Sequence, residues 1–328
     1  MLKKVAHNTD YQYISGIISH IKTTAMHDLK TNFDKFYGLT KEVLQEYLLE
    51  DGNIQHYRNK PKMCDQEIIA LSLCCEAMSI DSENFFWSKL RKDYSKDFPH
   101  LVHLTRFNAR RKRLSSYIQR FNELLSASMQ QGENVYLVDS MPMPVCKLAR
   151  EKRMKVCCQQ FETAPDKGYS AVNGQYYLGY KLHLVITING VFHSMDLSKA
   201  SMHDLHYLGD VKHSGLNNCL LLADKGYLSS EKQIDLFTSV GIELKTPMRS
   251  NQKDFHRYPF VFSKSRKRVE TLFSQLCDQM MIKRNYAKTF EGLSARVISK
   301  VAAVTALQNM NLKNGRKLNH IKHALSAA

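Results

Sequence analysis

Residues 177–197, YLGYKLHLVITINGVFHSMDL, form the stretch that most strongly constrains the fold. Apolar residues alternate with others through Tyr177–Ile188 and recur through Val191–Leu197, and Asn189-Gly190 lies between the two runs. Asn-Gly is typical of the two-residue turn of a β-hairpin, because both central positions of that turn need a positive φ. The stretch therefore predicts two long antiparallel strands.

Shorter apolar runs flank this hairpin on both sides. Val135–Val138 precedes it, and Leu220–Ala223 and Ile242–Thr246 follow it, separated by helical patterns near Met202–Lys212 and at Ser230–Val240. The order is strand, hairpin, helix, strand, helix, strand and helix. This order predicts an α/β fold with a mixed sheet, in which three antiparallel strands are extended by parallel ones and helices cover both faces. It is the order of an RNase H-like fold.

The part of the chain before this sheet has a helical pattern. Helices are expected over Asp81–Leu90 and over Thr105–Leu125, and the second is strongly basic. Short helices followed by a basic one indicate a helix-turn-helix-like DNA-binding module, in which Arg110 and Arg111 would contact DNA. The alternative is that this basic face is merely exposed to solvent.

The charge balance points to a polyanionic partner. The chain of 328 residues has 47 Lys and Arg against 31 Asp and Glu, a formal net charge of +16. Such an excess favours phosphate contacts, although a basic protein without a charged partner is the alternative. We expect an all-helical DNA-binding region over residues 1–130, a catalytic domain over 131–312 with a basic insertion near 147–176, and a basic tail over 313–328.

Cysteine usage and hydropathy indicate a soluble intracellular protein. The eight cysteines include no Cys-x-x-Cys pair, which argues against a zinc knuckle or a disulfide framework. No apolar stretch reaches the roughly 18 residues that a membrane span needs. His203 and His206 have metal-ligand spacing, but Ser201 with Asp204 three residues later better fits the start of a helix.

Three acidic residues stand at the ends of expected elements. Asp139 follows Val135–Val138, Asp224 follows Leu220–Ala223, and Glu270 opens a helical segment. Because ligands bind at the carboxyl ends of strands in α/β sheets, we expect the three carboxylates to converge there. The alternative is local: an aspartate at a strand end is often a turn former, and a glutamate in a first helical turn favourably meets the helix dipole.

Converging carboxylates would suit phosphodiester chemistry. Two Mg²⁺ ions, with Mn²⁺ as a substitute, need only hard oxygen ligands and stabilise the attacking and leaving oxygens. Asp139 would bridge the ions, while Asp224 would bind one and Glu270 the other. Asp139, Asp224 and Glu270 are therefore the candidate catalytic and metal-binding residues.

Basic and aromatic residues around these acids are candidate DNA contacts. Lys225 would neutralise a phosphate and Tyr227 would stack on a base, unless it is a core tyrosine. Lys181 and His183 share one face of their expected strand, which either borders the DNA or is simply exposed to solvent. The candidate DNA-binding residues are Arg110, Arg111, Lys147, Lys152, Arg153, Lys181, His183, Lys225, Tyr227, Arg249, Arg266 and Arg268.

Three segments carry a family resemblance. VDS at 138–140, ADKGY at 223–227 and RKRVETLFSQL at 266–276 resemble the catalytic boxes of bacterial insertion-sequence transposases of the DDE type, and insertion sequence family 982 most closely. The resemblance runs from about residue 60 to 310. It implies a DNA transposase that binds the terminal inverted repeats of an element and performs metal-dependent strand cleavage and transfer into target DNA. It also implies a homodimer on DNA, in the bacterial cytoplasm and at the nucleoid when DNA is bound.

The third segment departs from the family pattern. Related transposases often have Tyr-x2-Arg-x3-Glu-x6-Lys around the third acid. Arg266 and Glu270 fit this pattern, but Ser263 stands at the Tyr position and Cys277 at the Lys position. Two rival functions stay open: a nuclease of the same fold that only hydrolyses DNA, and a catalytically inactive DNA-binding repressor.

Overall fold

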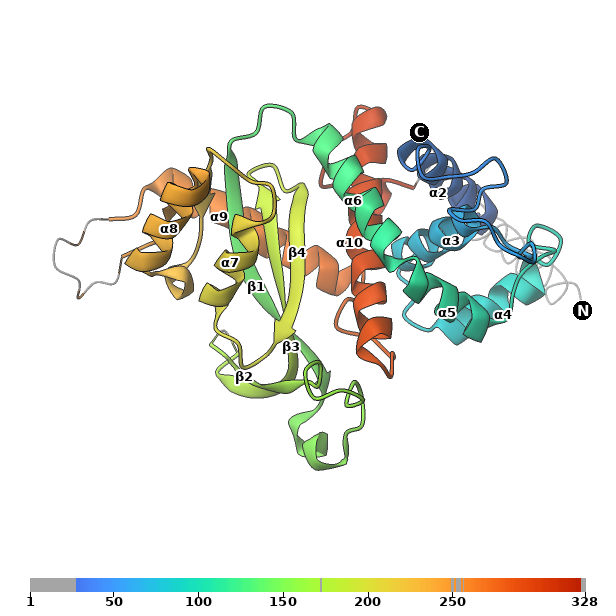
Figure 1. The fold of residues 1–328 in the computed structure, drawn as a ribbon, viewed down its shortest axis with the longest axis horizontal. Helices are drawn as coiled ribbons and strands as arrows, with labels where there is room; N and C mark the ends of the chain where they lie inside the picture. The colour runs from blue at the N-terminus through green and yellow to red at the C-terminus, as the bar shows by residue number, and fades with distance from the viewer. Residues whose placement is uncertain (1–27, 172, 249–250, 252–254, 256, 326–328) are drawn as a thin grey trace, which may run out of the picture.

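The computed structural model describes residues 28–171, 173–248, 251, 255 and 257–325. A helical region comes first, a sheet with interspersed helices follows, and a long helix packs between the two (Figure 1). The helices are α2 (Leu29–Val43), α3 (Asp65–Ala77), α4 (Glu83–Asp93), α5 (Leu104–Arg113), α6 (Ser115–Met129), α7 (Tyr207–Lys212), α8 (Ser230–Val240), α9 (Phe260–Asp278) and α10 (Phe290–Lys313). The strands are β1 (Val135–Cys146), β2 (Asp166–Ser170), β3 (Gln175–Thr187), β4 (Phe192–Lys199), β5 (Leu220–Leu222) and β6 (Glu243–Lys245). The short 3-10 helices are η1 (Leu148–Arg153), η2 (Asp204–His206), η3 (Lys225–Tyr227) and η4 (Ile321–His323).

The sheet has the predicted RNase H-like order. β3 pairs antiparallel with both β1 and β4. On its other side β1 pairs in parallel with β5, and β5 pairs in parallel with β6. The predicted hairpin is confirmed: Thr187 N donates to Val191 O at 2.8 Å, and Gly190 has a φ of +88°. Asn189 does not have the positive φ that the expected two-residue turn needs, so the turn itself differs from the prediction. Three antiparallel strands are thus extended by two parallel ones, as expected.

Two strands differ from the expectation. β2 lies within the insertion, for which no element was predicted. It pairs with residues 175–179 of β3, and β4 pairs with residues 180–186 that follow. β1 is much longer than Val135–Val138 and contains Pro142 and Pro144. Prolines are tolerated there because β5 pairs with β1 only up to Leu137, which leaves that edge of β1 without a partner strand.

Helices cover both faces of the sheet, as predicted. Along β1, Tyr136 and Val138 belong to a core with side chains of α7 and α8. Leu137 and Met141 belong to a second core, with side chains of α9, α10 and the N-terminal helices. Residues that alternate along one strand thus enter two different cores, which is the pattern of a sheet buried on both sides.

The helical region joins the rest of the molecule through α10 (Figure 1). α10 is buried along most of its length and packs against α6 and α3. Glu76 of α3 accepts hydrogen bonds from Arg296 at 2.9 and 3.2 Å and from Lys300, both on α10. Buried charges of opposite sign thus tie the two parts together.

Two further features differ from the sequence-based picture. The basic pattern over Thr105–Leu125 is two helices, α5 and α6, separated at Leu114. Near the C-terminus, Ile321 and Leu325 are buried in the core, a contact that the sequence analysis did not predict. Within the described ranges, none of the helices combines the length and the apolar character that crossing a bilayer requires.

Candidate active site

Asp139 and Asp224 lie side by side at one edge of the sheet. The parallel register places Leu137 of β1 opposite Leu222 of β5, and each aspartate follows two residues later. We expected Asp139 at the end of its strand, but β1 continues beyond it to Cys146. It lies instead where the β1–β5 pairing ends, which still brings the two carboxylates together.

The surroundings of Asp139 disfavour its charged form. Burial raises the pKa of this carboxyl to about 7, and the negative charges of Asp224 and Asp204 act in the same direction. The backbone N–H of Ser140, which donates to Asp139 Oδ1 at 2.8 Å, and the charge of Arg266 lower the pKa. Burial thus outweighs the nearby positive charge of Arg266 in setting the pKa of Asp139.

Asp224 shapes the turn that follows β5. Its Oδ1 accepts a hydrogen bond from Gly226 N at 2.8 Å and caps η3. The local capping role is thus present, but a carboxylate has two oxygens and about four acceptor positions, so this contact leaves capacity for another ligand. Lys225 in this turn is exposed, as a phosphate contact requires.

Asp204 is a residue of this site that the sequence analysis assigned elsewhere. Its Oδ1 accepts from Ser140 Oγ at 3.0 Å and from Lys181 Nζ at 3.1 Å. The expected helix start at Ser201 is wrong: Ser201 donates to Asp166, and the ring of His203 caps η2 instead. No spacing rule points to Asp204, because its partners lie 64 and 23 residues away in sequence.

Glu270 lies in the middle of α9 rather than at its start. It is exposed, and Arg266, one turn earlier on the same helix face, lies near enough to Asp139 to lower its pKa. Across the described part of the chain, no three His, Cys, Asp or Glu side chains gather closely enough to hold a metal ion. The convergence of Glu270 with the two aspartates stays a prediction.

Two predicted DNA contacts on α5 are buried, which corrects that expectation. Arg110 pairs with Asp65 and donates to the Met63 carbonyl, while Arg111 pairs with Glu83 and Glu76. These acids come from α3 and α4, so both guanidinium groups hold the helices together. The exposed cations of α5 are Arg106 and Arg113.

Two predicted contacts near the sheet are also buried. His183 is only 1% exposed, hydrogen-bonds Ser198 at 2.7 Å and stacks on Tyr207, because α7 covers this face of β3. Tyr227 is 0% exposed, so its ring is part of the core and has no surface on which a base would stack. Both expectations are therefore wrong in this structure.

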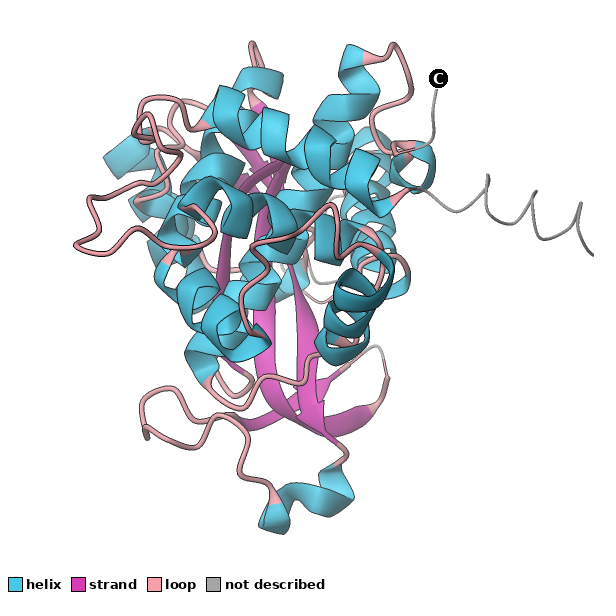
Figure 2. Cartoon of the chain, turned by 90° about the vertical axis from the view of Figure 1, so that its right-hand side faces the viewer, coloured by secondary structure: helices cyan, strands magenta, loops and turns pink. Residues whose placement is uncertain are grey.

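The remaining candidates have mixed environments. Lys181 is mostly buried and ion-paired with Asp204, Arg266 is half-buried, and Arg249 lies outside the described residues. The exposed candidates are Lys147, Lys152, Arg153, Lys225 and Arg268. The first three lie at or in η1, in the loop that projects beyond the end of the sheet (Figure 2).

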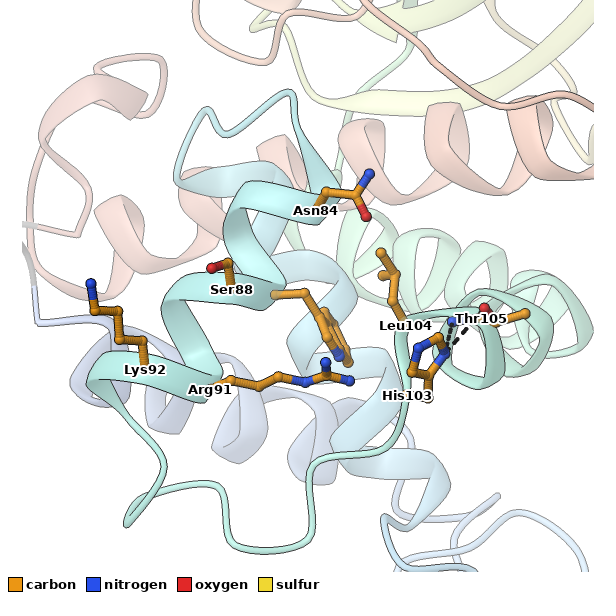
Figure 3. A pocket seen from close by; sticks show the side chains of 8 residues that line it. Asn84, Ser88, Arg91, Lys92, His103, Leu104 and Thr105 are labelled. Carbon is orange, nitrogen blue, oxygen red and sulfur yellow. Dashed lines mark hydrogen bonds between the residues drawn. The ribbon is translucent and has the colours of Figure 1, made fainter.

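A basic surface pocket in the helical region was not predicted. It has a volume of about 540 Å³ and lies between α4 and the start of α5 (Figure 3). Arg91 extends across it toward His103, whose ring bonds Thr105 Oγ1 at 3.1 Å. The pocket is lined by Asn84, Trp87, Ser88, Arg91, Lys92, His103, Leu104 and Thr105.

Comparison with known families agrees with this geometry. The sequence model of the transposase DDE domain matches residues 130–306, more than half of the chain and all six strands. The chain belongs to the transposase DDE domain family. It is therefore a DDE-type transposase, and its aspartates at the β1–β5 edge lie inside the matched region.

Other comparisons are weaker. No curated protein sequence matches this transposase significantly. A solved structure described as the Mos1 transposase paired-end complex with left transposon end is similar at 13% identity over 78% of this chain and 81% of that chain, with a TM-score of 0.22. At this TM-score the two folds do not superpose well enough for residues to be matched.

Proposed function

We propose that this transposase is a member of insertion sequence family 982 that binds the ends of its element, cleaves a DNA strand there and joins it to target DNA. The observation that carries the proposal is the side-by-side placement of Asp139 and Asp224 within a DDE domain. The resemblance of residues 138–140, 223–227 and 266–276 to that family supports the narrower assignment.

The residues present fit a divalent cation. Asp139, Asp224 and Glu270 would hold two Mg²⁺ ions, or Mn²⁺ in their place, since these ions prefer carboxylate oxygens. Asp139 is largely buried beside the negative charges of Asp224 and Asp204, and a bound cation would offset that charge. When bound, the ions supply electrostatic stabilisation of the attacking and leaving oxygens in an in-line displacement.

The protein groups would position the DNA and neutralise its charge. Arg266 lies near enough to Asp139 to lower its pKa, and its half-buried guanidinium would contact a phosphate oxygen there. Exposed Lys225 follows Asp224 directly and would contact the flanking backbone. The released 3′ hydroxyl would then attack target DNA at the same carboxylates.

DNA binding would be shared between the helical region and the projecting loop. Because Arg110 and Arg111 are buried, we propose that Arg91 and Arg106 make the phosphate contacts in the helical region. Exposed Lys152 would add contacts from the insertion. The proposed division is a DNA-binding region to residue 130, a catalytic domain over 131–312 and a basic segment over 313–328. Handling two element ends together requires a homodimer on DNA.

Single-turnover nicking of an end-containing duplex with Mg²⁺ tests the active site. Asp139→Asn, Asp224→Asn and Glu270→Gln should each abolish nicking and keep the affinity for DNA. Glu231→Gln, at an exposed position on α8, is the matched control and should nick at the wild-type rate. Wild-type nicking by Glu270→Gln would remove Glu270 from the site.

The products separate the transposase from its rivals. Strand-joined product distinguishes it from a nuclease that only hydrolyses DNA. Metal-independent binding without cleavage under any divalent ion would instead indicate an inactive repressor.

Salt dependence tests the DNA contacts. Arg91→Ala and Arg106→Ala should each flatten the dependence of log affinity on log salt by about 0.9, the value for one phosphate contact on duplex DNA. Arg120→Ala, at an exposed position on α6 paired with Glu123, is the control. An unchanged slope in both test variants would remove this surface from the DNA interface.

A further inference from the structure

We propose that Asp204 is a positioning residue of the metal site: it holds the residue next to Asp139 and adds a third negative charge beside Asp139 and Asp224. This inference rests on the proposed metal-binding role of those two aspartates. The side chain comes from η2, between the hairpin and β5, and would act without being a direct ligand.

Asp204 links the two elements that supply the aspartates. Toward β1, its Oδ1 accepts from Ser140 Oγ at 3.0 Å, and Ser140 N in turn donates to Asp139 Oδ1 at 2.8 Å. Toward the turn after β5, a methyl group added to Gly226 would lie 3.5 Å from Asp204 Oδ2 and 2.9 Å from Asp224 Oδ1. Oδ1 of Asp204 therefore contacts the residue after Asp139, and Oδ2 lies near the turn that Asp224 caps.

A buried hydroxyl supports a ligand site between these carboxylates. Tyr227 is 0% exposed, and its hydroxyl has no hydrogen-bond partner among the described residues. Burial raises the pKa of this hydroxyl, and the negative charges of Asp204, Asp139 and Asp224 act in the same direction. A buried hydroxyl is normally hydrogen-bonded, so this donor is free to serve a ligand or a ligand-bound water held by the carboxylates.

Lys181 determines how much of the charge of Asp204 is available. Its Nζ lies 3.1 Å from Asp204 Oδ1 and also donates to the Met202 carbonyl at 2.7 Å. The ion pair is largely withdrawn from water, with side-chain exposures of 16% and 25%. A cation bound at Asp139 and Asp224 would therefore compete with Lys181 for the negative charge of Asp204. Lys181 would also repel that cation, because both are positively charged.

This competition can be tested, because the direction in which the Mn²⁺ affinity changes in each variant distinguishes the proposed role from a purely structural one. Mn²⁺ affinity is measured on the full chain without DNA, by electron paramagnetic resonance of free Mn²⁺ and by calorimetry. Asp204→Asn keeps the shape of the side chain but loses its charge, and should weaken Mn²⁺ binding about 10-fold or more, as changes to groups that support metal ligands do. Lys181→Met should strengthen binding, because it removes a positive charge beside Asp204, and should do so in the Asp204→Asn background as well, where the lysine charge has lost its partner.

The control is Asp210→Asn, which removes one negative charge from an exposed position on α7, and it should bind Mn²⁺ with wild-type affinity. Asp139→Asn tests the underlying metal site in parallel. If Asp139→Asn binds Mn²⁺ like the wild type, the proposed metal site itself fails. If Asp139→Asn weakens binding but Asp204→Asn does not, or if Lys181→Met leaves affinity unchanged or lower, the role of Asp204 alone is overturned. Circular dichroism of each variant shows that a loss is not unfolding, and the gain expected from Lys181→Met has no explanation in misfolding.

Discussion

Replacing Asp139 by Asn should change how the stability of the metal-free protein depends on pH. Burial raises the pKa of Asp139 to about 7 in the folded protein, with a further contribution from Asp224, against about 3.9 in an unfolded chain. Between these two values the folded protein holds a proton that the unfolded chain has lost. The free energy of unfolding therefore falls as the pH rises from about 4 to about 7, by at most about 1.4 kcal/mol per pH unit.

The assay is urea unfolding in EDTA at several pH values between 5 and 8, for the wild type and Asp139→Asn. The asparagine carries no charge at any of these pH values. As the pH rises to about 7, the free energy of unfolding of the variant should therefore increase relative to that of the wild type. Above about pH 7 the difference between the two proteins should stay constant. His183 and His193 have lowered pKa values because they are buried, and they impose the opposite trend on both proteins. The difference between the two curves isolates Asp139.

Parallel curves for the two proteins would refute the reasoning, because they would mean that Asp139 ionises as it does in the unfolded chain. Adding Mn²⁺ supplies a second check. The ion should stabilise the wild type increasingly as the pH rises, since a carboxyl must lose its proton to bind it, and should stabilise Asp139→Asn much less.

Three further predictions concern neighbouring features. Gly226→Ala should lower both Mn²⁺ affinity and nicking, because its methyl group would lie 2.9 Å from Asp224 Oδ1; wild-type values for both would contradict the assigned turn geometry. Glu76→Gln should cost about 3–5 kcal/mol in urea unfolding at pH 7, because it removes the carboxylate that the buried Arg296 and Lys300 share and leaves Glu83, 3.6 Å from Arg296, to balance them; a cost below about 1 kcal/mol would show that Glu83 compensates for the loss. Arg266→Ala should strongly reduce nicking while Mn²⁺ binding persists, with only partial rescue by Lys, which lacks the bidentate fork; wild-type nicking would exclude Arg266 from catalysis.

Local patterns of the sequence were enough to predict the sheet. Asn189-Gly190 specifies a tight hairpin by its backbone preferences, and the period-two runs around it identify the strands without knowledge of their partners. β2 and the second half of β1 were not predicted. β2 is short and polar and is a strand only because the start of β3 offers a free edge, while Pro142 and Pro144 disguise the second half of β1.

Asp139 and Asp224 could be chosen from the sequence because each follows a buried apolar run, and parallel strands align such residues at one edge. Asp204 could not be chosen in this way. Its partners Ser140 and Lys181 come from other strands, and their approach depends on where η2 packs against the sheet.

The charged and aromatic residues show most clearly what the sequence alone determined. It determined that α5 is a basic helix and that Tyr227 follows a turn beside Asp224. Only the tertiary structure decided that Arg111 pairs with Glu76 and that Tyr227 is buried in the core. The physical reason is that periodicity and turn chemistry act between neighbours in the chain, whereas desolvation and ion pairing depend on groups that folding brings together from distant segments.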